Sequence, residues 1–218
     1  MSRSRYDLIV FDWDGTLMDS VGKIVRCFAA ALADTGIEGP GDDAIRNIIG
    51  LGLTEAVAAL LPGHGEAART AVVDRYREHF LHLDPGESEL FPGVAPGLAR
   101  LNDQGYLLAV ATGKSRRGLE RVLNGTALQP LFAATRCADE TFSKPHPQML
   151  HDILDCTGTD PRRALMVGDT VYDLEMARNA RVDGLGVSYG VHERIRLLQL
   201  EPRAVLDSFA GVCDWLAE

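Results

Sequence analysis

Two aspartates separated by one residue, Asp12 and Asp14, are the first residues of this chain that could do chemistry. They follow the apolar run 6–11, which has the composition of a buried strand, and Gly15 allows a sharp turn after them. Buried carboxylates are costly unless they pair with cations, bind a metal or take part in a reaction. By itself, the pair is equally consistent with a solvated turn at a strand end. Whether the pair belongs to a reactive site or to a solvated turn therefore depends on which other residues lie beside it in the fold.

Three later segments carry polar side chains at positions suited to a shared site. The first follows a strand predicted at 106–111, the second precedes a helix predicted at 146–156, and the third follows a strand predicted at 164–167. Ligands of open α/β sheets bind beyond the carboxyl ends of the strands, so these side chains are expected at one edge of the sheet. The set comprises Thr112, Gly113, Lys144, Asp169 and Asp173.

The residue types in this set favour phosphoryl chemistry with a hard metal ion. Carboxylates gathered without histidine or thiolate suit Mg2+, which binds few protein oxygens and completes its shell with water and substrate phosphate. A lysine and a helix N-terminus can supply positive charge to a phosphoryl group. Asp12 could act as a nucleophile that forms an aspartyl-phosphate, and Asp14 as general acid and then base.

The pattern of apolar residues predicts two kinds of architecture in one chain. Residues 17–83 have apolar side chains at helical spacing and no convincing strand, which indicates about four helices and a small bundle. We expect Thr54 to cap one of these helices, and Pro145 to occupy the first position of a later one. From residue 94, helices and strands alternate. The expected helices are 94–103, 115–124, 146–156 and 171–180 with a terminal helix through Leu216, and the expected strands are 106–111, 131–134, 164–167, 184–187 and 204–206.

This alternation is typical of a doubly wound parallel α/β sheet. The strand at 6–11 must join the same sheet, because a lone strand cannot bury both of its faces. The helical segment is therefore an insertion after the first strand.

Composition narrows the classes of partner. The 218 residues carry a formal charge of −9, which argues against nucleic acid or an anionic membrane as the main partner. Four cysteines are widely spaced and are expected to be unpaired thiols in a reducing compartment. No stretch reaches the ~18 apolar residues of a membrane span. We therefore expect a cytoplasmic protein whose partner is a small molecule, either as a monomer or as a small homo-oligomer.

Four signatures in order give the chain a family resemblance. They are D-W-D-G-T at 12–16, A-T-G-K at 111–114, S-K-P-H-P at 143–147 and G-D-T-V-Y-D at 168–173. Together they resemble the haloacid dehalogenase superfamily of phosphohydrolases, and most of all its phosphoglycolate phosphatase-type members. The resemblance covers essentially the whole chain. It implies a Rossmann-like core of residues 1–16 and 88–218, and a helical cap domain of residues 17–87.

The resemblance also implies a role for each signature residue. Asp12 would be the nucleophile and a ligand of Mg2+. Asp14 would be the general acid and base, with its backbone carbonyl on the metal, and Asp169 would complete the protein ligands. Asp173 would support the metal-bound waters or Lys144 from behind.

The remaining signature residues would hold the phosphoryl group. Thr112 and Lys144 would bind its oxygens, together with backbone groups of Gly113 and Trp13. The Trp13 side chain is expected to be mainly packing. His146, although close to the site, is expected to be structural.

The cap is expected to set specificity. Lys23, Arg26 and Arg46 are candidates for binding a carboxylate or second phosphate of the substrate, and the loop 50–52 could close over the site. Lys114 and the two arginines that follow it could also reach a substrate, although charges in a first helical turn are more often solvated.

The leading hypothesis is hydrolysis of a small phosphate monoester such as 2-phosphoglycolate. A phosphomutase of the same fold, a pyrophosphatase or nucleotidase, and a non-enzymatic binding module are alternatives. A dehalogenase is disfavoured because it needs no Mg2+. A phosphonate hydrolase would need a Schiff-base lysine in the cap, where Lys23 is the only candidate.

Overall fold

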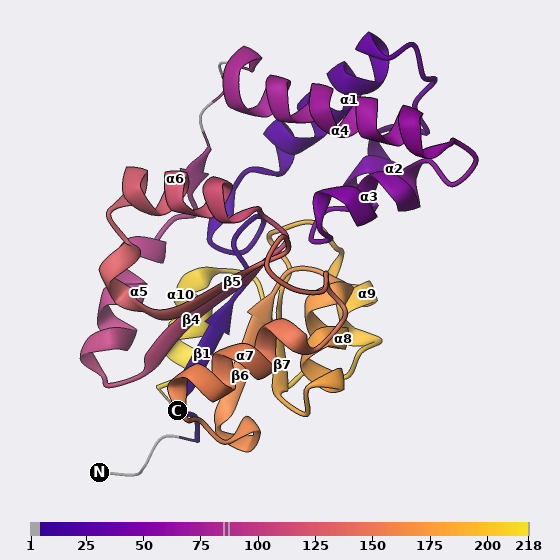
Figure 1. The fold of residues 1–218 in the computed structure, drawn as a ribbon. Helices are drawn as coiled ribbons and strands as arrows, with labels where there is room; N and C mark the ends of the chain where they lie inside the picture. The colour runs from indigo at the N-terminus through magenta and orange to yellow at the C-terminus, as the bar shows by residue number, and fades with distance from the viewer. Residues whose placement is uncertain (1–4, 85, 87, 218) are drawn as a thin grey trace.

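A six-stranded parallel sheet forms the centre of the molecule, in a computed structural model that describes residues 5–84, 86 and 88–217. Its strand order is β5-β4-β1-β6-β7-β8 (Figure 1). The strands are β1 (Leu8–Phe11), β4 (Leu107–Thr112), β5 (Phe132–Cys137), β6 (Ala164–Gly168), β7 (Asp183–Val187) and β8 (Val205–Leu206). The first strand lies between β4 and β6, so the predicted doubly wound parallel sheet is confirmed.

Helices cover both faces of the sheet, and the side-chain alternation of β1 explains how. Ile9 and Phe11 point to a cluster that includes residues of α5, α6 and α10, whereas Leu8 and Val10 point to a cluster with α7 and α8. The helices are α5 (Val94–Asp103), α6 (Arg116–Thr126), α7 (Gln148–Thr157), α8 (Val171–Asn179), α9 (Arg194–Leu198) and α10 (Phe209–Trp215), with 3-10 turns at Gln129–Leu131 (η2) and Pro161–Arg163 (η3).

The segment after β1 forms a separate group of helices, seen at the top of Figure 1. It contains α1 (Val21–Asp34), α2 (Asp42–Asn47), α3 (Leu53–Leu60), α4 (Glu66–Glu78) and a π-helical turn, η1 (His79–Leu83). These helices share a hydrophobic cluster of their own, which includes Phe28, Ile45, Val57 and Val72. The predicted helical bundle is thus present as a layer distinct from the sheet.

Two short strands that the sequence did not predict connect the helical group to the core. β2 (Met18–Asp19) pairs antiparallel with β3 (Glu89–Leu90), so the chain enters and leaves the helical segment at one place. Each strand has only two residues, which is too short for an alternating pattern to show.

Two expected helix starts are wrong. α3 begins at Leu53 with Gly52 in extended backbone at the cap position, and Thr54 lies inside the helix. α7 begins at Gln148 after Pro147, so Pro145 lies in the preceding turn, together with Lys144, and not in the helix. The five-residue helix α9 was also missed, because it is shorter than a reliable periodic window.

Among the described residues the cysteines are free, with Cys27, Cys137 and Cys213 buried and Cys156 exposed. No helix in the described part of the chain is both long and apolar enough to cross a bilayer.

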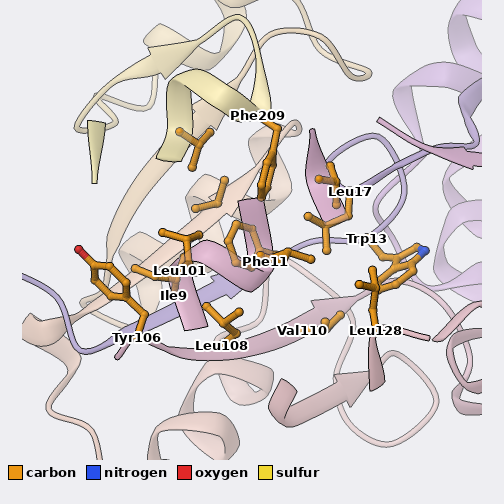
Figure 2. Packing of buried hydrophobic residues seen from close by; sticks show 14 of the residues in the cluster. Ile9, Phe11, Trp13, Leu17, Leu101, Tyr106, Leu108, Val110, Leu128 and Phe209 are labelled. Atoms are coloured by element: carbon orange, nitrogen blue, oxygen red, sulfur yellow. The ribbon is translucent and has the colours of Figure 1, made fainter. Parts of the chain in front are cut away.

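Phe209 closes one face of the core. Its ring lies 5.8 Å from that of Phe11, centroid to centroid, and both rings belong to the cluster that contains Leu101 and Ile9 (Figure 2). Phe209 is 2% exposed, whereas Phe142 on the loop before α7 is 63% exposed. The same residue type therefore occupies two opposite environments.

We expect Phe209→Ala to lower the free energy of unfolding by about 3–5 kcal/mol, because it removes buried apolar area and leaves a cavity. Phe142→Ala, the matched control, should cost less than about 1 kcal/mol. Urea denaturation followed by circular dichroism measures both. Equal losses for the two variants would contradict this description of the core.

Candidate active site

A buried ammonium group joins two of the predicted carboxylates. Lys144 Nζ lies 2.8 Å from Asp12 Oδ1 and 2.7 Å from Asp173 Oδ1, and all three side chains are almost fully buried. Asp12 extends directly from β1, Lys144 lies in the turn before α7, and Asp173 is in the first turn of α8. The structure thus brings together side chains that are up to 161 positions apart in sequence.

The start of α8 fixes Asp173 by a reciprocal cap. Thr170 donates from its backbone N–H and its hydroxyl to Asp173 Oδ2, at 3.1 and 2.7 Å, and the Asp173 N–H faces the Thr170 hydroxyl. This capping box satisfies N–H groups that a helix start otherwise leaves unpaired. It leaves Oδ1 of Asp173 for Lys144.

Asp169 is held by groups from two other segments. Thr16 Oγ1 donates to its Oδ1 at 2.7 Å, and the Val191 N–H donates to its Oδ2 at 2.8 Å. A Cβ on Gly15 or Gly190 would lie 2.2 or 2.3 Å from Asp169 Oδ2. Both positions therefore exclude any side chain.

The donor set of this site fits a hard divalent cation. Asp12, Asp169 and Asp173 each offer an oxygen within 4.8 Å of the others. Asp12 Oδ2 is buried and has no hydrogen-bond partner among the described residues. A buried, unpartnered carboxylate oxygen beside other carboxylates calls for a cation, and an all-oxygen donor set suits Mg2+.

The charges of the site perturb one another strongly. Burial, offset in part by Lys144, raises the pKa of Asp12 to about 7. Burial and the charges of Asp12 and Asp173 raise the pKa of Asp169 well above its usual range. Although burial alone would lower it, the two neighbouring carboxylates raise the pKa of Lys144, which stays charged. Lys144 pairs with only two of the three clustered carboxyl groups, so negative charge exceeds positive charge in this cluster.

Asp14 lies apart from this cluster and has its own partners. Its two carboxylate oxygens each lie 2.8 Å from Lys114 Nζ, and Ser20 Oγ donates to Oδ1 at 2.5 Å. Its side chain is not one of the three clustered carboxylates, so any bond from Asp14 to the metal would come from its carbonyl. The expectation that Lys114 is solvated is wrong, since its side chain is only 8% exposed. Ser20 was not singled out in the sequence.

Of the remaining predicted residues, Trp13 follows β1 and Thr112 ends β4, whereas His146 precedes α7. Thr112 is fully buried, and its Oγ1 accepts from the Lys114 N–H at 3.2 Å. The Trp13 N–H donates to Asp12 Oδ1 at 2.6 Å, while the indole packs edge-on against Phe132. The His146 ring packs against Phe142 at a tilt of 34°, and it accepts a hydrogen bond from the Gln148 N–H at the start of α7.

A large cleft of about 1010 Å3 lies between the core and the helical segment. Asp12, Asp14 and Thr112 line it from the core. The helical segment contributes an aromatic and cationic wall, which includes Lys23, Phe28, Tyr76, Arg77 and Phe80. The last four could not be singled out from the sequence, because their position in the cleft depends on how the helices face the core.

Two of the three cap cations proposed from the sequence are not part of this cleft's lining. Arg26 pairs with Asp84 at 3.0 Å and is largely exposed. Arg46 lines a separate hollow of about 330 Å3 with His192 and Arg196. Lys23 alone lines the main cleft, where it donates to the Gly86 carbonyl at 2.7 Å.

The loop 50–52 contacts the core at the site. The Gly52 N–H donates to Ser143 Oγ at 2.7 Å, next to Lys144. The carbonyl oxygens of Leu51 and Gly50 would lie 2.5 and 2.7 Å from a Cβ on Gly113. Glycine is therefore favoured at position 113, because the backbone of the loop 50–52 leaves no room for a Cβ atom there.

We expect Gly113→Ala to lower the free energy of unfolding by about 1–3 kcal/mol, because the added methyl group collides with the loop. Gly125→Ala, in open space on α6, should instead raise it by about 0.5–1 kcal/mol, since alanine is the better helix former. Thermal or urea unfolding compares the two. Effects of the same sign would show that the packing of Leu51 on Gly113 is not a constraint.

Comparisons with known proteins agree with this geometry. The family described as haloacid dehalogenase-like hydrolase matches residues 9–187. "Probable phosphatase IndB" of Dickeya dadantii is 39% identical, over 94% of this chain and 91% of that protein. The phosphoglycolate phosphatase of Agrobacterium fabrum is 32% identical, over 100% of this chain and 95% of that protein.

Solved structures give the same result for the fold. A crystal structure described as a predicted phosphoglycolate phosphatase, from Haemophilus somnus 129pt, is 26% identical with a TM-score of 0.86, and the match covers 98% of this chain and 99% of that one. The sequence signatures, the sheet with its strand-end carboxylates and these matches lead to one conclusion: the chain belongs to the haloacid dehalogenase-like hydrolase family, with phosphatases among its relatives.

Proposed function

We propose that this protein is a Mg2+-dependent phosphatase that hydrolyses a small phosphate monoester through an aspartyl-phosphate on Asp12. The observation that carries the proposal is the buried contact of Asp12 with Lys144, beside Asp169 and Asp173. An acidic group and an ammonium group buried together at a strand end are costly for stability, and catalysis gives a reason to keep them.

In the first step a carboxylate oxygen of Asp12 attacks phosphorus. The bond from phosphorus to the leaving oxygen breaks, and that oxygen takes a proton from Asp14. The Asp12 Oδ1 atom already accepts from Trp13 and lies beside Lys144, whereas Oδ2 has no partner among the described residues. In the second step a water oxygen bonds to phosphorus while Asp14 takes a proton from that water. The bond from phosphorus to Asp12 breaks, the Asp12 carboxylate is restored, and inorganic phosphate leaves.

The other residues neutralise and orient the phosphoryl group. Lys144 offsets the repulsion between the phosphoryl oxygens and Asp12, and the Thr112 hydroxyl with the backbone around Gly113 would bind those oxygens. Mg2+, held by Asp12, Asp169 and the Asp14 carbonyl, would supply the further positive charge that the transferring group needs. Asp173 keeps Lys144 in place.

The substrate would be small and anionic. The match to proteins named phosphoglycolate phosphatase supports a phosphoglycolate-like ester, and Lys23 and Arg77 supply cations to the cleft. Residues 1–16 and 88–218 would act as the core domain and 17–87 as the cap domain. A cytoplasmic location, and a partner that is neither nucleic acid nor membrane, remain predictions.

Two alternatives use the same cleft. A phosphomutase of this fold would share the first half-reaction and return the phosphoryl group to a sugar. A structure from Bacteroides vulgatus named as a beta-phosphoglucomutase has a TM-score of 0.84 at 19% identity, which supports the fold alone. A phosphonate hydrolase would need a reactive cap lysine, whereas Lys23 binds the Gly86 carbonyl.

We expect Asp12→Asn to lower kcat for an aryl phosphate by about 1000-fold or more, because a neutral amide is a poor nucleophile. Asp103→Asn, at the exposed end of α5, is the matched control and should leave kcat unchanged. Release of inorganic phosphate in the presence of Mg2+ is the measurement. Full activity of Asp12→Asn would sink the mechanism, and transfer to a sugar in place of phosphate release would favour the mutase.

Binding of Mg2+ should depend on pH. In the metal-free protein the pKa values of Asp12 and Asp169 are raised, so both groups hold protons at a pH where free aspartate is ionised. Mg2+ binds the ionised forms, so its apparent affinity should rise between pH about 6 and about 8, with release of protons.

Isothermal titration calorimetry in two buffers of different ionisation enthalpy counts these protons. Asp169→Asn should weaken Mg2+ binding by about tenfold or more. Binding that is independent of pH, or that takes up protons, would contradict the proposed ligand set.

A further inference from the structure

The carboxylate of Asp14 is fixed from two sides by groups outside the metal cluster. Lys114 Nζ lies 2.8 Å from each of its oxygens, and Ser20 Oγ donates to Oδ1 at 2.5 Å. The side chains of Lys114 and Asp14 are 8% and 13% exposed. These contacts are charge-assisted and shielded from water, so they constrain both side-chain torsions of Asp14.

Lys114 is itself held between the core and the helical segment. Its backbone N–H donates to the hydroxyl of Thr112 at the end of β4. Its ammonium group lies 5.1 Å from the ring centroid of Phe80, which belongs to η1. An ammonium group at this distance from an aromatic ring is attracted to it.

Lys23 provides an internal comparison. Its ammonium group lies at the same 5.1 Å from the Phe80 ring, but it donates to the Gly86 carbonyl and not to a carboxylate. The two lysines thus share the aromatic contact and the cleft, and they differ in the contact with Asp14.

We propose that Lys114 is a positioning residue that holds the Asp14 carboxyl group against the leaving oxygen of the substrate. This inference rests on the proposed phosphatase function. A general acid works only within hydrogen-bond reach of the atom it protonates, and an unsupported aspartate samples several rotamers. Lys114 bonds both oxygens, so it can remain on one oxygen while the other carries the proton.

The proton balance of the step is closed by groups already named. When the bond between phosphorus and the leaving oxygen breaks, the electron pair stays on that oxygen, which takes the proton of Asp14. The resulting carboxylate stays bound to Lys114 and Ser20, and it then accepts a proton from the attacking water. Lys114 gives up no proton in either half.

Substrates with different leaving groups distinguish a positioning role of Lys114 from a purely structural role and from a substrate-binding role. An alkoxide is a poor leaving group and needs the acid, whereas 4-nitrophenolate leaves readily without it. A positioning role for Lys114 therefore predicts a loss that depends on the leaving group. A purely structural role would reduce activity on all substrates equally, and a substrate-binding role would act on KM for anionic leaving groups.

The experiment compares Lys114→Met, Lys114→Arg and the control Lys23→Met. The probes are n-propyl phosphate and 4-nitrophenyl phosphate, neither of which has a second anionic group, with Mg2+ present. The measured quantity is kcat/KM, which reports the steps up to departure of the leaving group. Circular dichroism and thermal unfolding establish that each variant is folded.

We expect Lys114→Met to lower kcat/KM by about 100-fold for the propyl ester and by less than about 5-fold for the nitrophenyl ester. Lys114→Arg should recover about tenfold of the propyl loss, because its guanidinium group can also bond both oxygens. In Lys23→Met the ratio between the two esters should stay at the wild-type value.

Equal losses on both esters in Lys114→Met, or an altered ratio in Lys23→Met, would overturn the positioning role. If the wild-type protein hydrolyses both esters and Lys114→Met changes neither, the inference alone fails. If the wild-type protein hydrolyses neither ester with Mg2+, the proposed function fails together with it.

Discussion

The contact of Lys144 with Asp12 and Asp173 is the constraint around which the site is arranged. One buried ammonium group pairs with two of three clustered, buried carboxyl groups. Desolvation of such charges costs more than their mutual attraction returns unless every lone pair finds a partner. Most of these carboxylate oxygens have hydrogen-bond donors: Thr170 at the start of α8 donates to Asp173, and Thr16 and Val191 donate to Asp169. Among the described residues of the site, the oxygen Oδ2 of Asp12 is left without a partner, and the proposed Mg2+ would supply one.

The order of the strands explains why such a cluster can form at all. β1 lies between β4 and β6, and Phe11 is in register with Val110 on one side and Val167 on the other. Asp12 therefore emerges between the polar ends of both neighbours, at Thr112 and at Asp169. A parallel sheet brings these ends together without any contact between the side chains themselves, so the core supplies precise placement before any charge is paired.

Asp12, Thr112 and Asp169 could be predicted from sequence as site residues, because each follows a recognisable buried strand and ligands bind at such strand ends. Lys144 came from its signature, because a turn before a helix has no such rule. The partners of Asp14, Lys114 and Ser20, could not be predicted from sequence. A lysine at the start of a helix is normally solvated, and only the packing of Phe80 from another part of the chain covers Lys114. The two-residue strands β2 and β3, and the exclusion of Arg46 from the cleft, depend likewise on tertiary distances.

Asp12 and Asp14, although two residues apart, belong to mechanically different parts of the molecule. Asp12 is anchored to the sheet, since its N–H donates to Val167 and its carboxylate meets Lys144. Asp14 bridges to Met18 at β2, and its partner Ser20 is the cap residue of α1. Its second partner, Lys114, contacts Phe80 of η1. A displacement of the helical segment would therefore act on Asp14, the proposed acid and base, and would leave Asp12, the proposed nucleophile, in place. The D-x-D spacing thus places one carboxylate on the sheet and the other on groups that contact the helical segment.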